Sequence, residues 1–240
     1  PPENPRPAPG LPGLPSSLMK PPPISHVTVY CSSSNRLHPD YLDLARAIGD
    51  GLARSGRTLV YGGGKLGMMG VCAKSCRESG GRVVGIITGL LAEAEQMDPD
   101  NHENVVVQTM SERKQLLEER GDAILVLPGG IGTLEEFFAV FVGKLVGEHE
   151  KPIILANIRD PDDPSTRYFD PLLAMLDHVI ASRFAKPAAM ELLHICEDSE
   201  QIMQTLAELD QSPPATVGDR RRFMPGLPDP ELSQPNPTTR

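Results

Sequence analysis

Residues 123–146 read AILVLPGGIGTLEEFFAVFVGKLV. An apolar run of five residues comes first, a glycine-rich stretch follows, and the remainder places apolar residues at three- and four-residue spacing. This order predicts a buried strand, a tight turn and an amphipathic helix, which together form half of a βαβ unit. Because strand and helix patterns of this kind alternate along the chain, the sequence predicts a single-domain α/β fold with a parallel sheet.

The predicted elements extend outward from this stretch in both directions. Strands are predicted at residues 26–32, 58–61, 82–87, 123–127, 152–156 and 192–196, with a further short one at 105–108. Helices are predicted at residues 41–53, 68–78, 111–119, 134–146, 171–180 and 199–209. In such sheets ligands bind beyond the carboxyl ends of the strands, so we expect a site on the strand-to-helix turns.

Proline divides the chain into three parts. The sequence has 240 residues with 25 prolines and no tryptophan, and the prolines gather at both ends. Residues 1–24 and 211–240 are therefore predicted to be disordered tails, and residues 25–210 to be the folded nucleotide-binding domain. A length of 240 residues suits one such domain.

Charge and cysteine usage limit the classes of function. The net charge of −9 argues against a nucleic-acid partner, because that affinity comes mostly from Lys and Arg on phosphates. The four cysteines lack C-x-x-C spacing and predict buried, reduced thiols rather than a metal site. No apolar run has the length of a membrane span, and the first residues lack the layout of a signal peptide. We therefore expect a cytoplasmic protein with no membrane partner.

Three turns that follow apolar strands are rich in Gly or Ser. They lie at residues 31–34, at 62–64 with further glycines at 67 and 70, and at 129–133. Glycine lets backbone approach a ligand closely, and a turn that opens a helix presents unpaired N–H groups. The turns predict a phosphate-bearing ligand.

Two common phosphate motifs do not fit the second turn. Residues 62–67 match G-x-G-x-x-G, but the next strand ends in Ile-Ile-Thr-Gly, without the acidic residue of a dinucleotide site. A triphosphate loop would need Gly-Lys-Ser/Thr, whereas Gly67 is followed by Met68. Neither a nicotinamide cofactor nor a triphosphate is therefore expected.

Charged residues accompany the third turn. Glu135 and Glu136 lie in the first turn of the predicted helix, where the helix dipole alone could explain them. Beside a phosphate site, a carboxylate could instead reach the ribose and act on its anomeric carbon. Arg113 and Lys114 begin another predicted helix; alone they indicate a solvated face, and together with the turns they indicate contacts to the same ligand.

Three motifs resemble those of the LONELY GUY (LOG) family of cytokinin riboside 5′-monophosphate phosphoribohydrolases. They are P-G-G-x-G-T-x-x-E at residues 128–136, M-x-x-R-K at 110–114, and L-V-Y-G-G-G-x-x-G-x-M-G at 59–70. The resemblance covers about residues 26–210. It implies a Rossmann-like fold, a homodimer or larger assembly, and hydrolysis of a nucleotide to base and ribose 5-phosphate without cofactor or metal.

The resemblance also implies roles for individual residues. Arg113 and Glu136 would be catalytic. The predicted substrate-binding residues are Ser33, Gly62, Gly63, Gly64, Glu95, Lys114, Gly129, Gly130, Ile131, Gly132, Thr133, Leu134 and Glu135.

Alternatives remain for the substrate and for the activity. The family's I-P-x-x-L segment is Ile-Thr-Gly-Leu-Leu at residues 87–91, and a substrate-contacting Thr of plant members aligns with Val142. AMP or other purine nucleotides therefore fit as well as a cytokinin nucleotide. A nucleotide-binding module without catalysis is the second alternative. Lysine decarboxylase, a label often given to such proteins, does not fit, because Lys65, Lys114 and Lys144 lack the context of a pyridoxal phosphate site.

Overall fold

The computed structural model describes residues 23–94, 96–211 and 223. Its elements in chain order are β1 (His26–Tyr30), α1 (Pro39–Arg54), β2 (Thr58–Tyr61), α2 (Gly67–Glu78), β3 (Val83–Thr88), α3 (Gly89–Ala94), β4 (Glu103–Val107), α4 (Met110–Arg120), β5 (Ala123–Val126), α5 (Ile131–Val146), β6 (Ile153–Ala156), α6 (Asp170–Ala181), the 3-10 helix η2 (Pro187–Leu192), β7 (Leu193–Cys196) and α7 (Ser199–Leu209). The alternation of strands and helices that the sequence predicts is confirmed.

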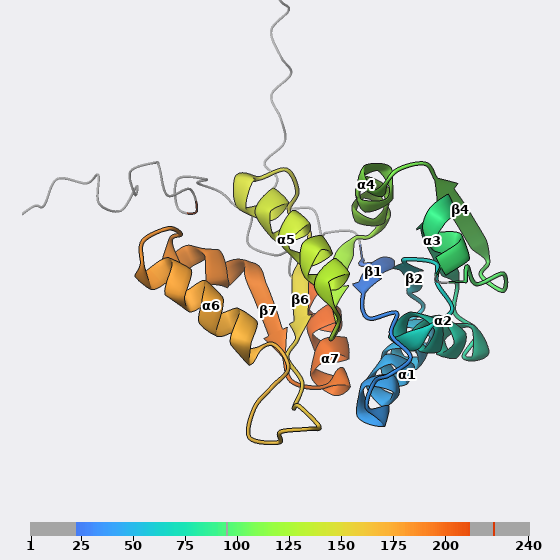
Figure 1. Cartoon of the computed structure of the whole chain (residues 1–240), viewed down its shortest axis with the longest axis horizontal. Coiled ribbons are helices and arrows are strands. Elements are labelled where there is room, and N and C mark those ends of the chain that lie inside the picture. Colours follow the sequence, from blue (N-terminus) through green and yellow to red (C-terminus); the bar gives the residue numbers. More distant parts are fainter. Residues whose placement is uncertain (1–22, 95, 212–222, 224–240) are drawn as a thin grey trace, which may run out of the picture.

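Within these residues the strands form one sheet in the order β4-β3-β2-β1-β5-β6-β7, with every neighbouring pair parallel. Figure 1 shows β4 at one edge and β7 at the other. A crossover between parallel strands usually contains a helix, and the predicted helices supply every crossover except that from β3 to β4, which contains α3. The predicted α/β class, a parallel sheet with helices on both faces, is confirmed.

Alternating side chains of the central strands supply two cores. Leu125 of β5 belongs to the cluster under α1, α2 and α7, whereas Ile124 and Val126 belong to the cluster under α4, α5 and α6. Strands covered on both faces read as continuous apolar runs, as β5 does. Figure 1 shows α1 and α2 on the opposite side of the sheet from α4 and α5.

The ends of the predicted domain differ slightly from the expected boundaries. Ile24 is buried in the first core, and its N–H donates to Asp210 at 2.7 Å. Phe223 is 5% exposed and belongs to the second core, although it falls in the predicted C-terminal tail. The other predicted tail residues, 1–22, 212–222 and 224–240, lie outside the described residues.

Two short helices were not predicted. The residues of α3 follow β3 without a gap, and η2 leads directly into β7. Both have only six residues, too few to show an apolar period in the sequence.

Candidate active site

The order of strands changes direction at β1. From β1 the chain adds β2, β3 and β4 on one side, and then returns to add β5, β6 and β7 on the other. The helix after β1 packs on one face of the sheet and the helix after β5 on the opposite face. The two turns therefore diverge and open a crevice at the carboxyl ends of β1 and β5, the usual ligand position in such folds.

A cavity of about 390 Å³ lies in this crevice. Its walls come from the turn after β1 and from the first turns of α2, α4 and α5. The lining residues are Cys31, Ser32, Ser33, Ser34, Met69, Met110, Arg113, Gly130, Ile131, Gly132, Thr133, Glu135 and Glu136. A cavity of this size suits a small ligand such as a nucleoside monophosphate.

The first turn of α5 presents backbone N–H groups to the cavity. The helix begins at Ile131, three residues before the predicted start, because Gly130 takes the N-cap position and Gly132 and Thr133 already belong to the helix. Gly130 makes no side-chain cap, and the first amides of a helix have no partner within it. Together with the positive end of the helix dipole they suit a phosphate.

Arg113 reaches the cavity from the first turn of α4. Thr109 and Glu112 form a capping box at 3.2 Å in both directions, which fixes where this helix begins. Arg113 is 4% exposed. Its guanidinium donates from Nε to the Ile86 carbonyl at 3.0 Å and from Nη2 to the Gly62 carbonyl at 3.3 Å. These bonds hold the guanidinium plane in one orientation.

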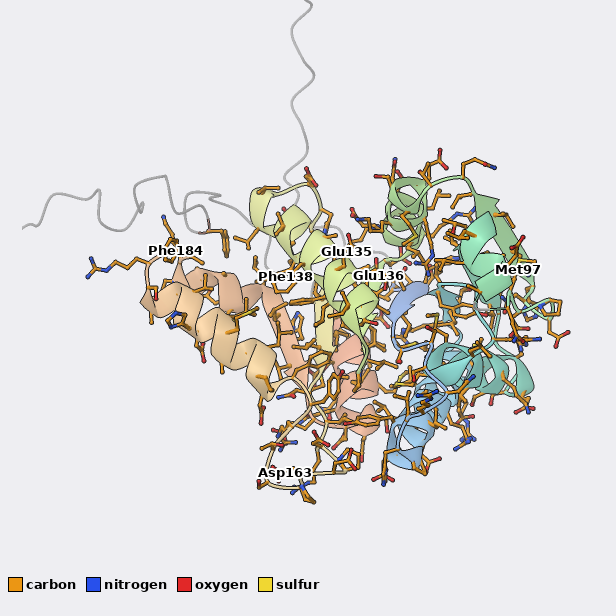
Figure 2. All side chains as sticks on the ribbon, in the orientation of Figure 1. Met97, Glu135, Glu136, Phe138, Asp163 and Phe184 are labelled. Carbon is orange, nitrogen blue, oxygen red and sulfur yellow. The ribbon has the colours of Figure 1, made fainter. Side chains whose placement is uncertain are left out.

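Glu136 forms an ion pair with Arg113 at the wall of the cavity. Arg113 Nη1 donates to Glu136 Oε1 at 3.1 Å, and Glu136 is 8% exposed. Figure 2 labels Glu136 and Glu135 on α5, on its side toward α4 and β1. Removal of one partner of such a buried pair leaves an unpaired buried charge, which typically costs about 3–5 kcal/mol. Burial, together with the negative charge of Glu136, also raises the pKa of the Tyr30 hydroxyl far above its ordinary value.

A second, more exposed ion pair lies beside the first. Lys114 Nζ contacts Glu135 Oε1, and both side chains are partly open to solvent. Glu135 lines the cavity, whereas Lys114 is outside the lining that we describe. The two pairs link α4 to α5 at successive positions, which brings the two predicted motifs into one site.

The second predicted turn is placed differently. Gly62, Gly63 and Gly64 are buried and lie outside the described lining of the cavity. Gly62 contacts Arg113 through its carbonyl, and Gly63 accepts a hydrogen bond from the Asp98 N–H at 2.9 Å. The turn thus helps to hold Arg113 in place through the Gly62 carbonyl. Contact between this turn and a phosphate stays a prediction.

The remaining predicted residues fall into three groups. Ser33 lines the cavity with its neighbours Ser32 and Ser34. Gly129 lines an adjoining cavity, and Leu134 packs on the second core. Glu95 lies outside the described residues.

Sequence reasoning missed several lining residues. Met69 and Met110 are positions of the motifs at residues 59–70 and 110–114, but methionines are common core residues and were not chosen as ligand contacts. Cys31, Ser32 and Ser34 could have been chosen with Ser33, because the turn that contains them was already identified. Within the described ranges, no group of three or more His, Cys, Asp or Glu side chains could hold a metal ion. None of the described helices is long and apolar enough to cross a membrane.

Comparison with known proteins decides the family. Residues 69–206 match the family model described as "Possible lysine decarboxylase". A cytokinin riboside 5′-monophosphate phosphoribohydrolase of Mycobacterium tuberculosis is 39% identical over 75% of this chain and 92% of its own length. The chain belongs to the LONELY GUY family. A relative of the same name from Arabidopsis thaliana is 33% identical over 75% of this chain and 76% of its own.

Solved structures support the fold of this LONELY GUY family member. The molybdenum cofactor carrier protein of Chlamydomonas reinhardtii has a TM-score of 0.55 at 20% identity, over 79% of this chain and 98% of that one. A molybdenum cofactor binding protein of Rippkaea orientalis has a TM-score of 0.56 at 18% identity, over 80% and 99%. At these identities the similarity shows the Rossmann-like fold alone.

Proposed function

We propose that the protein hydrolyses the N-glycosidic bond of a purine or cytokinin nucleoside 5′-monophosphate, which yields the free base and ribose 5-phosphate. The observation that carries this proposal is the buried Arg113–Glu136 pair on the wall of the cavity that the first turn of α5 opens into. One end of the cavity suits a phosphate, and a carboxylate lies within the same space. The names of the curated relatives agree with this chemistry.

The phosphate is expected at the N-terminus of α5. Backbone N–H groups of residues 130–133 would hold it, assisted by the hydroxyls of Ser32–Ser34 across the cavity. Binding of the phosphate then fixes the position of the sugar, which lowers the entropic cost of bringing its C1′ carbon to the catalytic residues.

The ribose is expected beside Glu136. As the bond from C1′ to the base nitrogen breaks, its electron pair leaves with the base and positive charge develops on the sugar. A water oxygen bonds to C1′, and one of its protons ends on the base. Glu136 acts either as the general base for this water or as the stabiliser of the positive sugar, and Arg113 holds its carboxylate in place.

The identity of the base is a separate question. Relatives from three bacteria and from plants carry the cytokinin name, which favours a cytokinin nucleotide. The departures from the family pattern at residues 87–91 and at Val142 keep AMP as an alternative. In the structure, residues 89–91 begin α3, and Val142 is 52% exposed on α5.

Chromatography of the reaction products tests the activity. The purified protein is incubated with AMP and, separately, with isopentenyladenosine 5′-monophosphate, and free base and ribose 5-phosphate are quantified. Release from either establishes the hydrolase, and the ratio of rates identifies the substrate class. Binding without release from any nucleoside monophosphate would instead support a nucleotide-binding module without catalysis.

We further propose a homodimer or higher homo-oligomer in the cytoplasm. Met110, Ile131 and Val142 on α4 and α5 are large apolar side chains that are 45%, 84% and 52% exposed, and Met110 and Ile131 also line the cavity. Exposed apolar surface of this kind supports an interface. All four cysteines are free and buried, which agrees with a reducing compartment. Light scattering of the native protein and of Val142→Glu tests the assembly; a monomeric native protein would contradict it.

A further inference from the structure

Tyr168 is held rigidly beside the glycine turn that opens α5. It ends the loop between β6 and α6, and its N–H donates to the Ile158 carbonyl at 2.9 Å. The next residue, Phe169, donates its N–H to Asn157 Oδ1 at 2.7 Å. The Tyr168 ring packs edge-on against Tyr41 and Phe169, with centroids 5.6 Å and 4.9 Å away. Backbone and ring are thus both fixed.

The Tyr168 hydroxyl donates a hydrogen bond to the Gly129 carbonyl at 2.7 Å. The contact lies at a second cavity of about 230 Å³, lined by Tyr41, Pro128, Gly129, Gly130 and Tyr168 among others. Burial raises the pKa of the Tyr168 hydroxyl, so the group stays protonated and able to donate at neutral pH.

Three successive carbonyls of the turn each accept one hydrogen bond. The Pro128 carbonyl accepts from Ser32 N–H at 3.3 Å, and the Gly130 carbonyl accepts from Leu134 N–H at 3.0 Å. The middle carbonyl, that of Gly129, accepts from Tyr168. A peptide between two glycines rotates at little steric cost, so this middle peptide depends most on an external partner.

The direction of the Gly129 carbonyl also fixes the direction of the next amide. In a planar trans peptide the C=O of one residue and the N–H of the next point in opposite directions. Since the Gly129 carbonyl points to Tyr168, the Gly130 N–H points away from it. Gly130 lines both the cavity beside Tyr168 and the larger cavity that holds Arg113 and Glu136, so a Gly130 N–H directed away from Tyr168 is available to a ligand in the larger one.

We propose that Tyr168 is a positioning residue that orients the Gly129–Gly130 peptide so that the Gly130 N–H donates to the phosphate of the substrate. The inference deepens the proposed function and rests on it, because it assigns the phosphate to the N-terminus of α5. Tyr168 touches neither the sugar nor the base, and it acts through one peptide bond.

The test compares Tyr168→Phe with Tyr41→Phe, which removes a hydroxyl from the other ring of the same pair. The Tyr41 hydroxyl donates a long hydrogen bond of 3.4 Å to Asp160 rather than to the turn. Calorimetric titration with ribose 5-phosphate gives the affinity without turnover. We expect Tyr168→Phe to weaken binding about three- to tenfold, the loss of one hydrogen bond's contribution, and Tyr41→Phe to stay within about twofold.

Kinetics and melting separate positioning from general loosening. For whichever nucleotide is cleaved, KM should rise with kcat nearly unchanged in Tyr168→Phe, and the melting temperature should match that of Tyr41→Phe. Unchanged affinity for ribose 5-phosphate, or a fall in kcat alone, would overturn the role of Tyr168. If the native protein binds ribose 5-phosphate but releases no base, the hydrolase proposal fails while the calorimetric comparison still decides the role of Tyr168.

Discussion

Two glycine-rich turns that look alike in the sequence differ in what surrounds them. The turn after β5 opens onto the cavity at its helix end, where a Cβ added at Gly130 or Gly132 would meet no atom within 4 Å, although one at Gly129 would lie 2.1 Å from Thr133 Oγ1. The turn after β2 is packed, and a Cβ added at Gly62 would lie 2.1 Å from Arg113 Nη2. Glycine at position 62 therefore lets Arg113 keep its observed place. At Gly130 and Gly132 nothing within the described chain requires a glycine.

The difference indicates separate roles for the two turns: one leaves room for a ligand, and the other positions Arg113. The open turn leaves room for a ligand to approach the backbone, as a phosphate site needs. The packed turn lets Arg113 approach the backbone and donate to the Gly62 carbonyl. Arg113 then joins the turns, since its other nitrogen binds Glu136 beside the open turn.

The largest effect on turnover is expected for Glu136, which lies on the helix that follows the open turn. Glu136→Gln keeps the size of the side chain but removes its charge, so we expect kcat to fall about 100- to 10,000-fold. Ribose 5-phosphate should still bind, because the α5 amides are unchanged. Base release followed by chromatography measures the first and calorimetry the second. Near-normal turnover would contradict both roles proposed for Glu136.

The packed turn is expected to affect catalysis through Arg113. In Gly62→Ala the added methyl group displaces the guanidinium and weakens its bond to Glu136. We expect kcat to fall about 10- to 100-fold, as for a small misplacement of a catalytic group, with a weaker effect on phosphate affinity. Steady-state kinetics of the variant gives both. A rise in KM with unchanged kcat would show that this turn binds phosphate directly.

The open turn is expected to show the reverse pattern. Gly132→Ala places a methyl group in empty space within a helix, so the free energy of unfolding should rise by up to about 1 kcal/mol. If a phosphate approaches this backbone, KM should rise about tenfold. Denaturant unfolding and steady-state kinetics together measure the two effects. Greater stability with unchanged KM would remove the phosphate from this turn.

The same comparison shows how far sequence could go. The sequence predicts where β5 and α5 lie. The strand β5 is buried on both faces and reads as a continuous apolar run, whereas α5 is buried on one face and has apolar residues at three- and four-residue spacing. Pairing Arg113 with Glu136 in one site came from motif resemblance, and no local pattern measures the distance between residues on two helices.

The sequence does not show which glycines are packed against other residues and which leave room for a ligand. Gly62 and Gly132 both follow a strand and sit in a phosphate-like motif, yet what lies beside each depends on contacts far along the chain. Tyr168 was missed for the same reason: it lies 39 positions from Gly129, in a loop with no motif of its own. Long-range packing, rather than propensity, decides these positions.

Lys144 lies toward the other end of α5, far along the helix from the open turn. It is 2% exposed, Nζ donates to the Leu192 carbonyl at 3.4 Å, and it is outside the cavity lining that we describe. Burial lowers the pKa of Lys144 to about 8, although the charge of Glu150 opposes the shift. A buried lysine with a lowered pKa is the type of group that a decarboxylase would use for a Schiff base.

The smallest effect on activity is expected for Lys144→Met, and it tests whether the decarboxylase name of the family model applies to this chain. Lys144→Met should leave base release unchanged, because Lys144 lies outside the cavity lining that we describe. Between pH 8 and the ordinary lysine pKa of 10.5, the unfolded chain binds more protons than the folded chain. Burial of the Lys144 charge therefore destabilises the folded protein fully below pH 8. This destabilisation disappears as the pH rises toward 10.5. Lys144→Met removes this cost, and we expect it to be more stable than the native protein by about 2 kcal/mol at pH 7, with the difference shrinking toward pH 10.5. Unfolding in denaturant across this pH range measures the stability. If a stably folded Lys144→Met no longer released base, the activity would depend on buried Lys144 near the end of α5 as well as on the glycine turn at its start.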